Sequence, residues 1–287
     1  TTLGELQRWW NDPRRKGSAW WLARWLNPDR DEGAILADAD FEYKPGEEQA
    51  FSGFFVHRDY RNHGIGKRLY GLIEQAAAQQ PLARLYSGGP QAYTLRQEFL
   101  ARRGFEFDRY FWRMRLPADK AVPAPLLPEG YTVRAFVRGQ DEELFMNVRN
   151  ISFAEHFGST PYTPETAAYL IQQEMFQPEG LFFAFKGDEA AGYCWSAVSA
   201  EENARRKVSV GWIEHLGTVP GHRGVGLGRA LLLIGIQHLR QRVSVVELGV
   251  EGKNANALRL YESVGFYQES AWANMVKNLN KESNGDR

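Results

Sequence analysis

The chain has 287 residues, 43% of them hydrophobic and 13% aromatic, which is enough apolar material for one large core or two smaller ones. Its 35 basic and 35 acidic side chains cancel, so no overall charge attracts it to nucleic acid or to an anionic membrane. The single cysteine, Cys194, excludes an internal disulfide and multi-cysteine zinc sites, and the histidines show no ligand spacing, so no metal site is expected.

The first part of the chain is expected to contain a glycine loop followed by a helix. Its tryptophans are more typical of packed cores than of a ligand surface; they include Trp9, Trp10, Trp20, Trp21 and Trp25. The loop consists of Arg61, Asn62, His63, Gly64, Ile65, Gly66 and Lys67. The segment after the loop is predicted to be an amphipathic helix, because its apolar residues fall on one helical face. These residues are Leu69, Leu72, Ile73 and Ala76.

A proline-rich segment comes next. It contains Pro117, Pro123, Pro125 and Pro128, and such a segment supports neither a helix nor a central strand. We therefore predict a first domain over residues 1–116, a linker over 117–130 and a second domain over 131–279. The polar residues 280–287 are expected to form a disordered tail.

The second domain is predicted to be an α/β domain with a mixed sheet. A helix is expected over 141–157, followed by a loop around 159–163. Strands are expected over 181–186 and 191–198, joined by the hairpin signal Gly187-Asp188-Glu189. A further strand over 209–219 leads into a second glycine loop. Beyond it we expect a helix over 229–239, a strand over 243–250, a helix over 254–264 and a closing strand over 271–276.

The apolar content of this domain is expected to fill a core and not to enter a membrane. The longest aliphatic run, Ala230–Ile236, is too short to span a bilayer, and no signal segment opens the chain. Cys194 lies within an expected strand and is predicted to be a small core residue. These features predict a cytoplasmic protein with no membrane or nucleic-acid partner, and they predict no particular oligomeric state.

The two halves share two landmarks. The pattern Arg-x-x-Gly-x-Gly occurs at Arg61 and again at Arg223. A Gly-Phe pair follows each pattern at nearly the same distance in sequence: Gly104-Phe105 in the first half and Gly265-Phe266 in the second. A chance match of glycines would not bring a second landmark with it, so we interpret the chain as two copies of one fold. The first copy is shorter before its loop and is expected to lack about one strand and one helix.

The second loop consists of Arg223, Gly224, Val225, Gly226, Leu227, Gly228 and Arg229. Glycines between a strand and a helix N-terminus let the backbone approach a ligand and direct N–H groups at an anion, most often a phosphate. The alternative is that the glycines only form a tight turn. Lys67 is followed by Arg68 and not by Ser or Thr, and neither loop contains Gly-x-Gly-x-x-Gly, so two nucleotide-binding motifs are excluded.

The order strand, glycine loop, helix, strand, and then Asn254-x-x-Ala257-x-x-Leu260-Tyr261-x-x-x-Gly265-Phe266, resembles the Gcn5-related N-acetyltransferase (GNAT) superfamily. The resemblance covers the second copy and, more weakly, the first. It implies two tandem GNAT-type domains, the first truncated at its start. It also implies acetyl-CoA as co-substrate and a primary amine as acceptor, and we predict that this acceptor is a small molecule. The mycothiol synthases are tandem members, and residues 152–158 and 233–240 are similar to their second half.

The resemblance also implies roles for single residues. Backbone N–H groups of Gly224 to Arg229 would hold the coenzyme diphosphate. The strand residues that would hydrogen-bond the pantetheine arm are Leu216, Gly217 and Thr218. Asn254 stands at a coenzyme-contacting position or caps its helix, and Tyr261 stands where a tyrosine protonates the departing thiolate. The first loop, from Arg61 to Lys67, either holds a second coenzyme or only supports the second copy.

An amine is protonated at neutral pH, so a base, or a water chain leading to one, must remove its proton before it attacks a thioester. We predict that Glu214 is this base and that it shares a strand face with Trp212, Leu216 and Thr218 by the two-residue period. The alternative is an ordinary salt-bridged strand residue. Several members of the family place their glutamate two positions earlier, where this chain has Trp212.

The first copy has Leu100 in the place of Tyr261 and Tyr93 in the place of Asn254, so we predict a single catalytic half. Candidates for shaping the acceptor pocket are Phe153, His156 and Phe157, which are equally explained as core residues. Two alternatives to acetylation of a simple amine stay open. One is a cysteinyl amino-sugar acceptor, as for the mycothiol synthases. The other is an acyl-CoA-binding module without catalysis.

Overall fold

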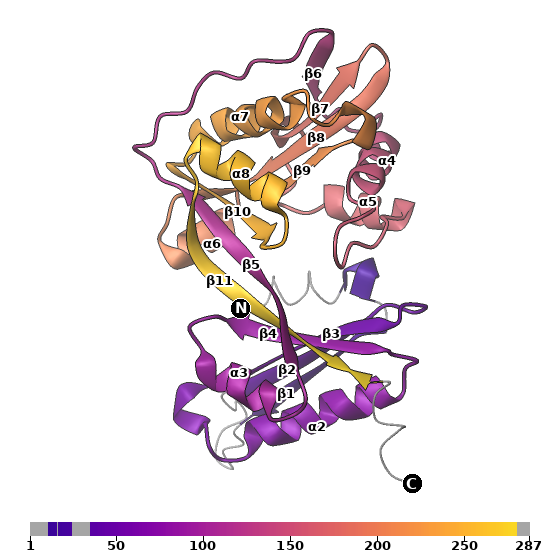
Figure 1. The fold of residues 1–287 in the computed structure, drawn as a ribbon, viewed down its shortest axis with the longest axis vertical. Coiled ribbons are helices and arrows are strands. Elements are labelled where there is room, and N and C mark those ends of the chain that lie inside the picture. Colours follow the sequence, from indigo (N-terminus) through magenta and orange to yellow (C-terminus); the bar gives the residue numbers. More distant parts are fainter. Residues whose placement is uncertain (1–10, 16, 25–34, 280–287) are drawn as a thin grey trace. The chain divides into compact units, whose positions relative to one another are not determined.

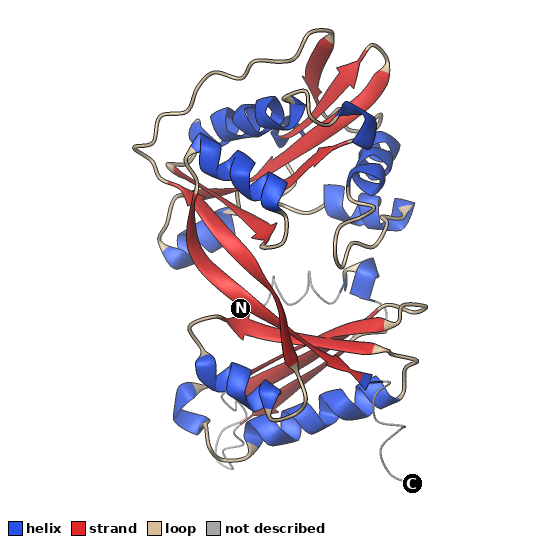
Figure 2. Cartoon of the chain, viewed as in Figure 1, coloured by secondary structure: helices blue, strands red, loops and turns tan. Residues whose placement is uncertain are grey.

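The computed structural model describes residues 11–15, 17–24 and 35–279, and it divides the chain into two compact units (Figure 1). Unit 1 comprises Thr1–Phe111 and Ala271–Arg287, and unit 2 comprises Trp112–Ser270. Each unit combines strands and helices, which confirms the predicted mixed α/β class (Figure 2). Trp9, Trp10 and Trp25, and the tail 280–287, lie outside the described residues.

Unit 1 is built around a sheet with the strand order β1-β2-β3-β4-β11. Its strands are β1 (Ala19–Arg24), β2 (Ile35–Tyr43), β3 (Gln49–Val56) and β4 (Arg84–Pro90). Its helices are α2 (Ile65–Ala78) and α3 (Thr94–Ala101), with short turns η1 (Pro13–Arg15) and η2 (Arg58–Tyr60). β3 and β4 run parallel, whereas β11 (Tyr267–Asn278) pairs antiparallel with β4 through residues 272–278.

The helix after the first loop packs as its sequence predicts. Leu69 and Ile73 of α2 are buried, and Leu72 and Ala76 are partly buried against the same core. Leu100 of α3 belongs to that core, so both helices cover one side of the sheet. Trp21 of β1 also packs against this core, as expected for a structural tryptophan.

Unit 2 has the strand order β5-β10-β9-β8-β7-β6. Its strands are the end of β5 (Glu106–Leu116), β6 (Tyr131–Ala135), β7 (Leu181–Lys186), β8 (Glu189–Ala197), β9 (Val210–Thr218) and β10 (Val245–Glu251). Its helices and turns are α4 (Glu142–Ser152), α5 (Pro164–Ile171), η3 (Pro178–Gly180), α6 (Ala200–Arg206), η4 (Pro220–His222), α7 (Leu227–Arg240) and α8 (Ala255–Val264). Among the helices of the described ranges, none combines the length and apolar character that a membrane crossing requires.

The sheet of unit 2 is covered on both faces (Figure 1). On one face, α7 and α8 share a core with β8, β9 and β10, and this core contains the fully buried Cys194. On the other face, Phe145 of α4 and Leu170 of α5 pack against Phe183, Tyr193 and other aromatic residues of β7 and β8. A strand buried on both faces requires apolar residues at successive positions, which explains the apolar run of β8.

Two strands cross the boundaries of the compact units. Met114 and Leu116 of β5 are completely buried in the core of unit 2, whereas Met275 of β11 is buried in the core of unit 1. The expected domains placed all of β5 in the first domain, 1–116, and all of β11 in the second domain, 131–279. In the structure, each of these strands is divided between the two units. Residues 117–130 contain no helix or strand, as the prolines predict, and Arg240 of α7 donates to the carbonyl oxygens of Pro117 and Lys120.

The helix expected over 141–157 ends at Ser152, so its predicted end is wrong. The apolar pattern continues through Phe153, but Phe153 has a φ of −112° and reaches the rings of Tyr193 and His215 from a turn. Burial of Phe153 therefore does not require another turn of helix.

Two glycines inside helices give opposite predictions. A Cβ added at Gly235 of α7 would lie 2.7 Å from Cys194 Sγ and 2.9 Å from Ile213 Cδ1, whereas Gly71 of α2 has no atom within 4 Å of that position. We expect Gly235→Ala to destabilise unit 2 by about 1–3 kcal/mol through overpacking. Gly71→Ala is expected to stabilise unit 1 by roughly 0.5–1 kcal/mol. Urea denaturation of both variants measures the two signs, and a stabilising Gly235→Ala would contradict the packing of α7 on β8 and β9.

Candidate active site

The centre of unit 2 is an opening between two parallel strands. β9 pairs with β10 from Val210 to Ile213, and the pairing ends there. The following residues of β9 therefore present one backbone edge that β10 does not occupy. A backbone edge of this kind accepts an extended ligand as an added strand. The predicted pantetheine-binding residues, Leu216, Gly217 and Thr218, lie on this part of β9.

The second glycine loop joins β9 to α7. Gly224 and Gly226 have φ angles of 82° and 90°, a left-handed region that favours glycine. Gly226 is the N-cap of α7, and no side chain caps the helix there. The N–H groups of the first turn of α7 therefore keep their capacity to bind an anion.

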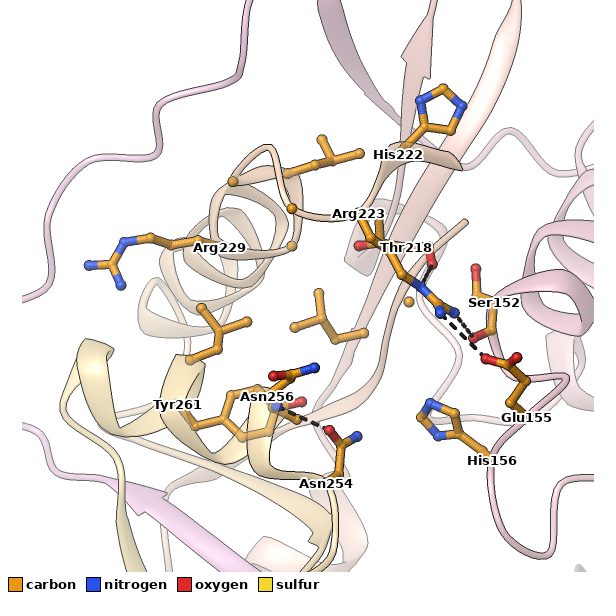
Figure 3. A pocket seen from close by; sticks show the side chains of 18 residues that line it. Ser152, Glu155, His156, Thr218, His222, Arg223, Arg229, Asn254, Asn256 and Tyr261 are labelled. Carbon is orange, nitrogen blue, oxygen red and sulfur yellow. Dashed lines mark hydrogen bonds and ion pairs between the residues drawn. The ribbon is translucent and has the colours of Figure 1, made fainter. Parts of the chain in front are cut away.

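Arg223 fixes the entry to this loop. Its Nε donates to the carbonyl oxygen of Thr218 at 3.1 Å, and its Nη2 donates to the carbonyl oxygen of Ser152 at 3.4 Å. Its Nη1 lies 3.5 Å from Glu155 Oε2 (Figure 3). Arg223 thus connects β9, the end of α4 and the loop after α4.

A cavity of about 580 Å³ lies at this loop. Most of the predicted site residues line it: Leu216, Gly217, Thr218, Arg223, Gly224, Gly226, Leu227, Gly228, Arg229, Asn254 and Tyr261. Val225 and Glu214 are not among the lining residues, and Val225 is exposed. The close-up shows Tyr261 and Asn254 on one side of the cavity, and Glu155 and His156 on another (Figure 3). The cavity therefore joins the loop, the free edge of β9 and the start of α8.

Tyr261 lies on α8 with only 7% of its surface exposed. Burial raises the pKa of its hydroxyl above the ordinary value, so the hydroxyl stays protonated at neutral pH. A protonated hydroxyl at a cavity wall is able to donate a proton. Asn254 caps α8, because its side-chain oxygen accepts the N–H of Ala257 at 3.1 Å. The capping alternative for Asn254 is confirmed, and its amide also faces the cavity.

Glu214 is the extra, unpaired residue of a β-bulge in β9. The register of β8 and β9 shifts between Trp195, opposite His215, and Ser196, opposite Ile213. Ile213 and Leu216 consequently pack against the same core, so Trp212 does not share a face with Leu216 and Thr218, and this part of the expected common face is wrong. The extra residue of the bulge reverses the two-residue alternation. Burial, with a contribution from the Glu202 carboxylate, raises the pKa of Glu214 to about 7.

The sequence did not predict several cavity residues: Ser152, Glu155, His222, Asn256, Ala257 and Leu260. Glu155 and Ser152 are distant in sequence from the glycine loop, and only the fold brings them to Arg223. His156 lines the cavity, as one of the acceptor candidates, and burial lowers its pKa. Phe153 does not line the cavity but packs 4.4 Å from His156, ring centre to ring centre.

The first loop repeats the geometry of the second. Arg61 Nε donates to the carbonyl oxygen of Val56 at 3.1 Å, as Arg223 Nε does to Thr218. Asn62 has a φ of 65°, where the second loop has Gly224, and Gly64 is the N-cap of α2. A cavity of about 560 Å³ lies at this loop, and among its lining residues are Arg61, Asn62, Gly64, Gly66 and Lys67. Tyr93 also lines it, whereas Leu100 is completely buried.

Comparison with known proteins assigns the family. The family model described as "Acetyltransferase (GNAT) family" matches residues 4–105 and 145–266. The chain belongs to the GNAT acetyltransferase family. It is an acetyl-CoA-dependent acetyltransferase with two GNAT regions in tandem.

This acetyltransferase is similar to several curated relatives. It is 34% identical over 250 residues to "Mycothiol acetyltransferase" of Thermobispora bispora, which covers 85% of this chain and 82% of the relative. A solved GCN5-related N-acetyltransferase from Sphaerobacter thermophilus has a TM-score of 0.73 at 25% identity, covering 96% of this chain and 85% of that one. A tandem GNAT protein from the clavulanic acid biosynthesis pathway has a TM-score of 0.67 at 18% identity, covering 91% and 83%, and supports the fold alone.

Proposed function

We propose that this acetyltransferase transfers an acetyl group to a primary amine of a small molecule, by direct attack within a ternary complex in unit 2. The observation that carries the proposal is the single cavity shared by the glycine loop, the free edge of β9, Asn254 and Tyr261. Acetyl-CoA supplies the acetyl thioester. The first loop keeps its cavity but has Leu100 in place of the acid, so catalysis is assigned to the second copy.

The residues of unit 2 fit two parts of the coenzyme, the diphosphate and the pantetheine arm. The left-handed Gly224 and Gly226 and the first turn of α7 offer N–H groups to the diphosphate. Leu216, Gly217 and Thr218 offer the backbone edge to the pantetheine arm. Arg229 Nη1 is bonded to Ser263 Oγ at 2.6 Å, so we assign to Arg229 its backbone N–H and not its side chain.

Glu214 and Tyr261 then divide the proton transfers. Glu214, with a pKa of about 7, removes a proton from the ammonium group of the acceptor, directly or through a water chain. The water chain is the natural route, because Glu214 does not line the cavity. Tyr261 donates a proton to the leaving thiolate. The free amine adds to the carbonyl carbon and the bond from carbon to sulfur breaks. The nitrogen then gives up its second proton, which restores the Tyr261 hydroxyl, and no covalent enzyme intermediate is needed.

The relatives favour one acceptor class. Their name, mycothiol acetyltransferase, supports a cysteinyl amino-sugar as acceptor, and the chain spans 82% of the Thermobispora relative. The departure at Trp212 concerns the general base and not the acceptor. Trp212 lies under the guanidinium of Arg113, 5.0 Å from the ring centre, so it is held as a structural residue where other members have a glutamate.

Steady-state rates with acetyl-CoA over a panel of acceptors test the proposed function and the acceptor class of the relatives. The panel contains polyamines, amino acids, amino sugars and a cysteinyl amino-sugar inositol. The main proposal expects turnover of at least one amine, with an intersecting-line pattern for a ternary complex. The relatives' acceptor class predicts activity on the cysteinyl compound and none on simple amines. Tight coenzyme binding without turnover of any amine would contradict both.

A further inference from the structure

The opening between parallel strands exists in both units. In unit 1, β3 pairs with β4 from Gln49 to Ser52, and the pairing ends opposite Ser87. The next residues of β3, Phe54 to Val56, line the cavity at the first glycine loop, as Leu216 to Thr218 line the cavity of unit 2. The two copies therefore offer the same kind of entry beside the loop.

In unit 1 this entry is filled by Arg96 of α3. Its Nη1 donates to the carbonyl oxygen of Phe54 at 2.5 Å, and its guanidinium carbon lies 4.5 Å from the centre of the Phe54 ring. A Cβ added at Gly89 of β4 would lie 2.6 Å from Arg96 Cδ. The side chain of Arg96 thus lies between β3 and β4. Counting back from the two Gly-Phe pairs, unit 2 has the small residue Ala257 at this position.

Arg96 is held in place by charge as well as by shape. Asp38 and Asp40 of β2 act on Arg96 as opposite charges, and burial lowers the pKa of Arg96 only to about 10, so it stays cationic at neutral pH. Its Nε and Nη2 are buried and have no hydrogen-bond partner among the described residues. A guanidinium that is buried between strands and compensated by carboxylates is costly to displace.

We propose that Arg96 closes unit 1 to the thioester arm, so that the first glycine loop accepts the nucleotide diphosphate end of a coenzyme but excludes the arm. This inference rests on the proposed role of the glycine loops. A strand-like arm needs the backbone edge of β3, and Arg96 already occupies the Phe54 carbonyl of that edge. The guanidinium also fills the space beside Gly89 through which the arm would pass. Arg96 is therefore a specificity-determining residue.

The test compares two ligands at unit 1 by calorimetry: coenzyme A and 3′-phosphoadenosine 5′-diphosphate, the same nucleotide without the arm. The full chain carries Gly228→Glu, which places a carboxylate at the second loop and is expected to prevent binding there by repelling the diphosphate. With Arg96 present, both ligands are expected to bind with equal affinity, within about twofold. In Arg96→Ala, coenzyme A is expected to bind roughly 10-fold tighter than the nucleotide, or about 1.4 kcal/mol.

Two matched variants distinguish the effect of the volume of the Arg96 side chain from the effect of positive charge at the cavity. Arg96→Met fills the opening without a charge and is expected to keep the two affinities equal. Arg102→Ala removes one cation from the exposed rim of the same cavity and is expected to weaken both ligands alike. Circular dichroism checks the fold of each variant.

Three results would overturn the inference: tighter binding of coenzyme A with Arg96 in place, no preference in a folded Arg96→Ala protein, or no binding of either ligand. The comparison of the two ligands with Arg96 in place needs no substitution at Arg96. Tighter binding of coenzyme A there would therefore overturn the inference even if Arg96→Ala does not fold. Failure of the proposed function is distinct, because it would be seen as absent amine turnover by the unmodified protein.

Discussion

Replacing Glu214 by glutamine is expected to lower kcat by about 10²–10⁴-fold, the usual contribution of a positioned general base. Glutamine keeps the shape of the side chain but accepts no proton. In the unmodified enzyme, kcat/KM is expected to rise with pH and to level off above about 7, where the Glu214 carboxyl loses its proton. The variant is expected to lose this limb. Rates measured from pH 5 to 9 on the best acceptor check both results.

The free energy of unfolding is expected to fall with rising pH, whereas kcat/KM rises. The folded pKa of Glu214 lies above the ordinary value of 4.5, so between about 4.5 and 7 the folded state binds more protons than the unfolded state. The free energy of unfolding therefore falls as pH rises through that window. Glu214→Gln removes this penalty and is expected to be more stable than the unmodified protein above pH 7, with no difference near pH 4.

Glu202 provides the matched control. Its carboxylate contributes to the raised pKa of Glu214, and it is paired with Arg206 at 2.9 Å on the surface of α6. Glu202→Gln is expected to shift the acidic limb of kcat/KM to lower pH while leaving the plateau unchanged. A Glu214→Gln enzyme with an unaltered pH profile would assign the base to another group.

The local elements of the second copy could be predicted because each has its own sequence signal. The hairpin at Gly187-Asp188-Glu189 joins β7 and β8 as expected, and the helices on either side of β10 begin within about two residues of their predicted starts. The glycine loop could be predicted because the backbone at Gly224 and Gly226 adopts a left-handed conformation that favours glycine. Most of the site follows these elements, since β9 leads into the loop and Asn254 caps α8.

The features that were missed depend on contacts between distant segments. Nothing local marks the bulge of β9, because the extra residue is defined only by the register with β8. The closing strand expected over 271–276 follows the second copy in sequence, and nothing in its own pattern shows that residues 272–278 pair with β4 of unit 1. Glu155 reaches Arg223 only after α4 has packed on the sheet. In the sequence, Arg96 looks like an ordinary helix residue. Its position beside the end of the pairing between β3 and β4 is seen only in the fold.

The Tyr261 hydroxyl is expected to matter for chemistry and not for folding. Tyr261→Phe keeps the ring that packs near Phe266, with ring centres 6.0 Å apart, so the free energy of unfolding and the Kd of acetyl-CoA are expected to stay nearly constant. We expect kcat to fall by about 10²-fold or more, because the thiolate then leaves without a proton donor. Tyr267→Phe is the control: Tyr267 is exposed and bonded to Glu269, and its loss is expected to leave kcat unchanged.

The leaving group distinguishes an acid from a residue that only shapes the cavity. A thiol with a lower pKa leaves as a stable thiolate and needs less help from a donor. With an acetyl thioester of such a thiol, the defect of Tyr261→Phe is expected to shrink toward the rate of the unmodified enzyme. A shaping role would give the same defect with every leaving group. Equal kcat for the variant and the unmodified enzyme on acetyl-CoA would remove Tyr261 from the mechanism, since a buried hydroxyl at the cavity wall would then take no part in the departure of the thiolate.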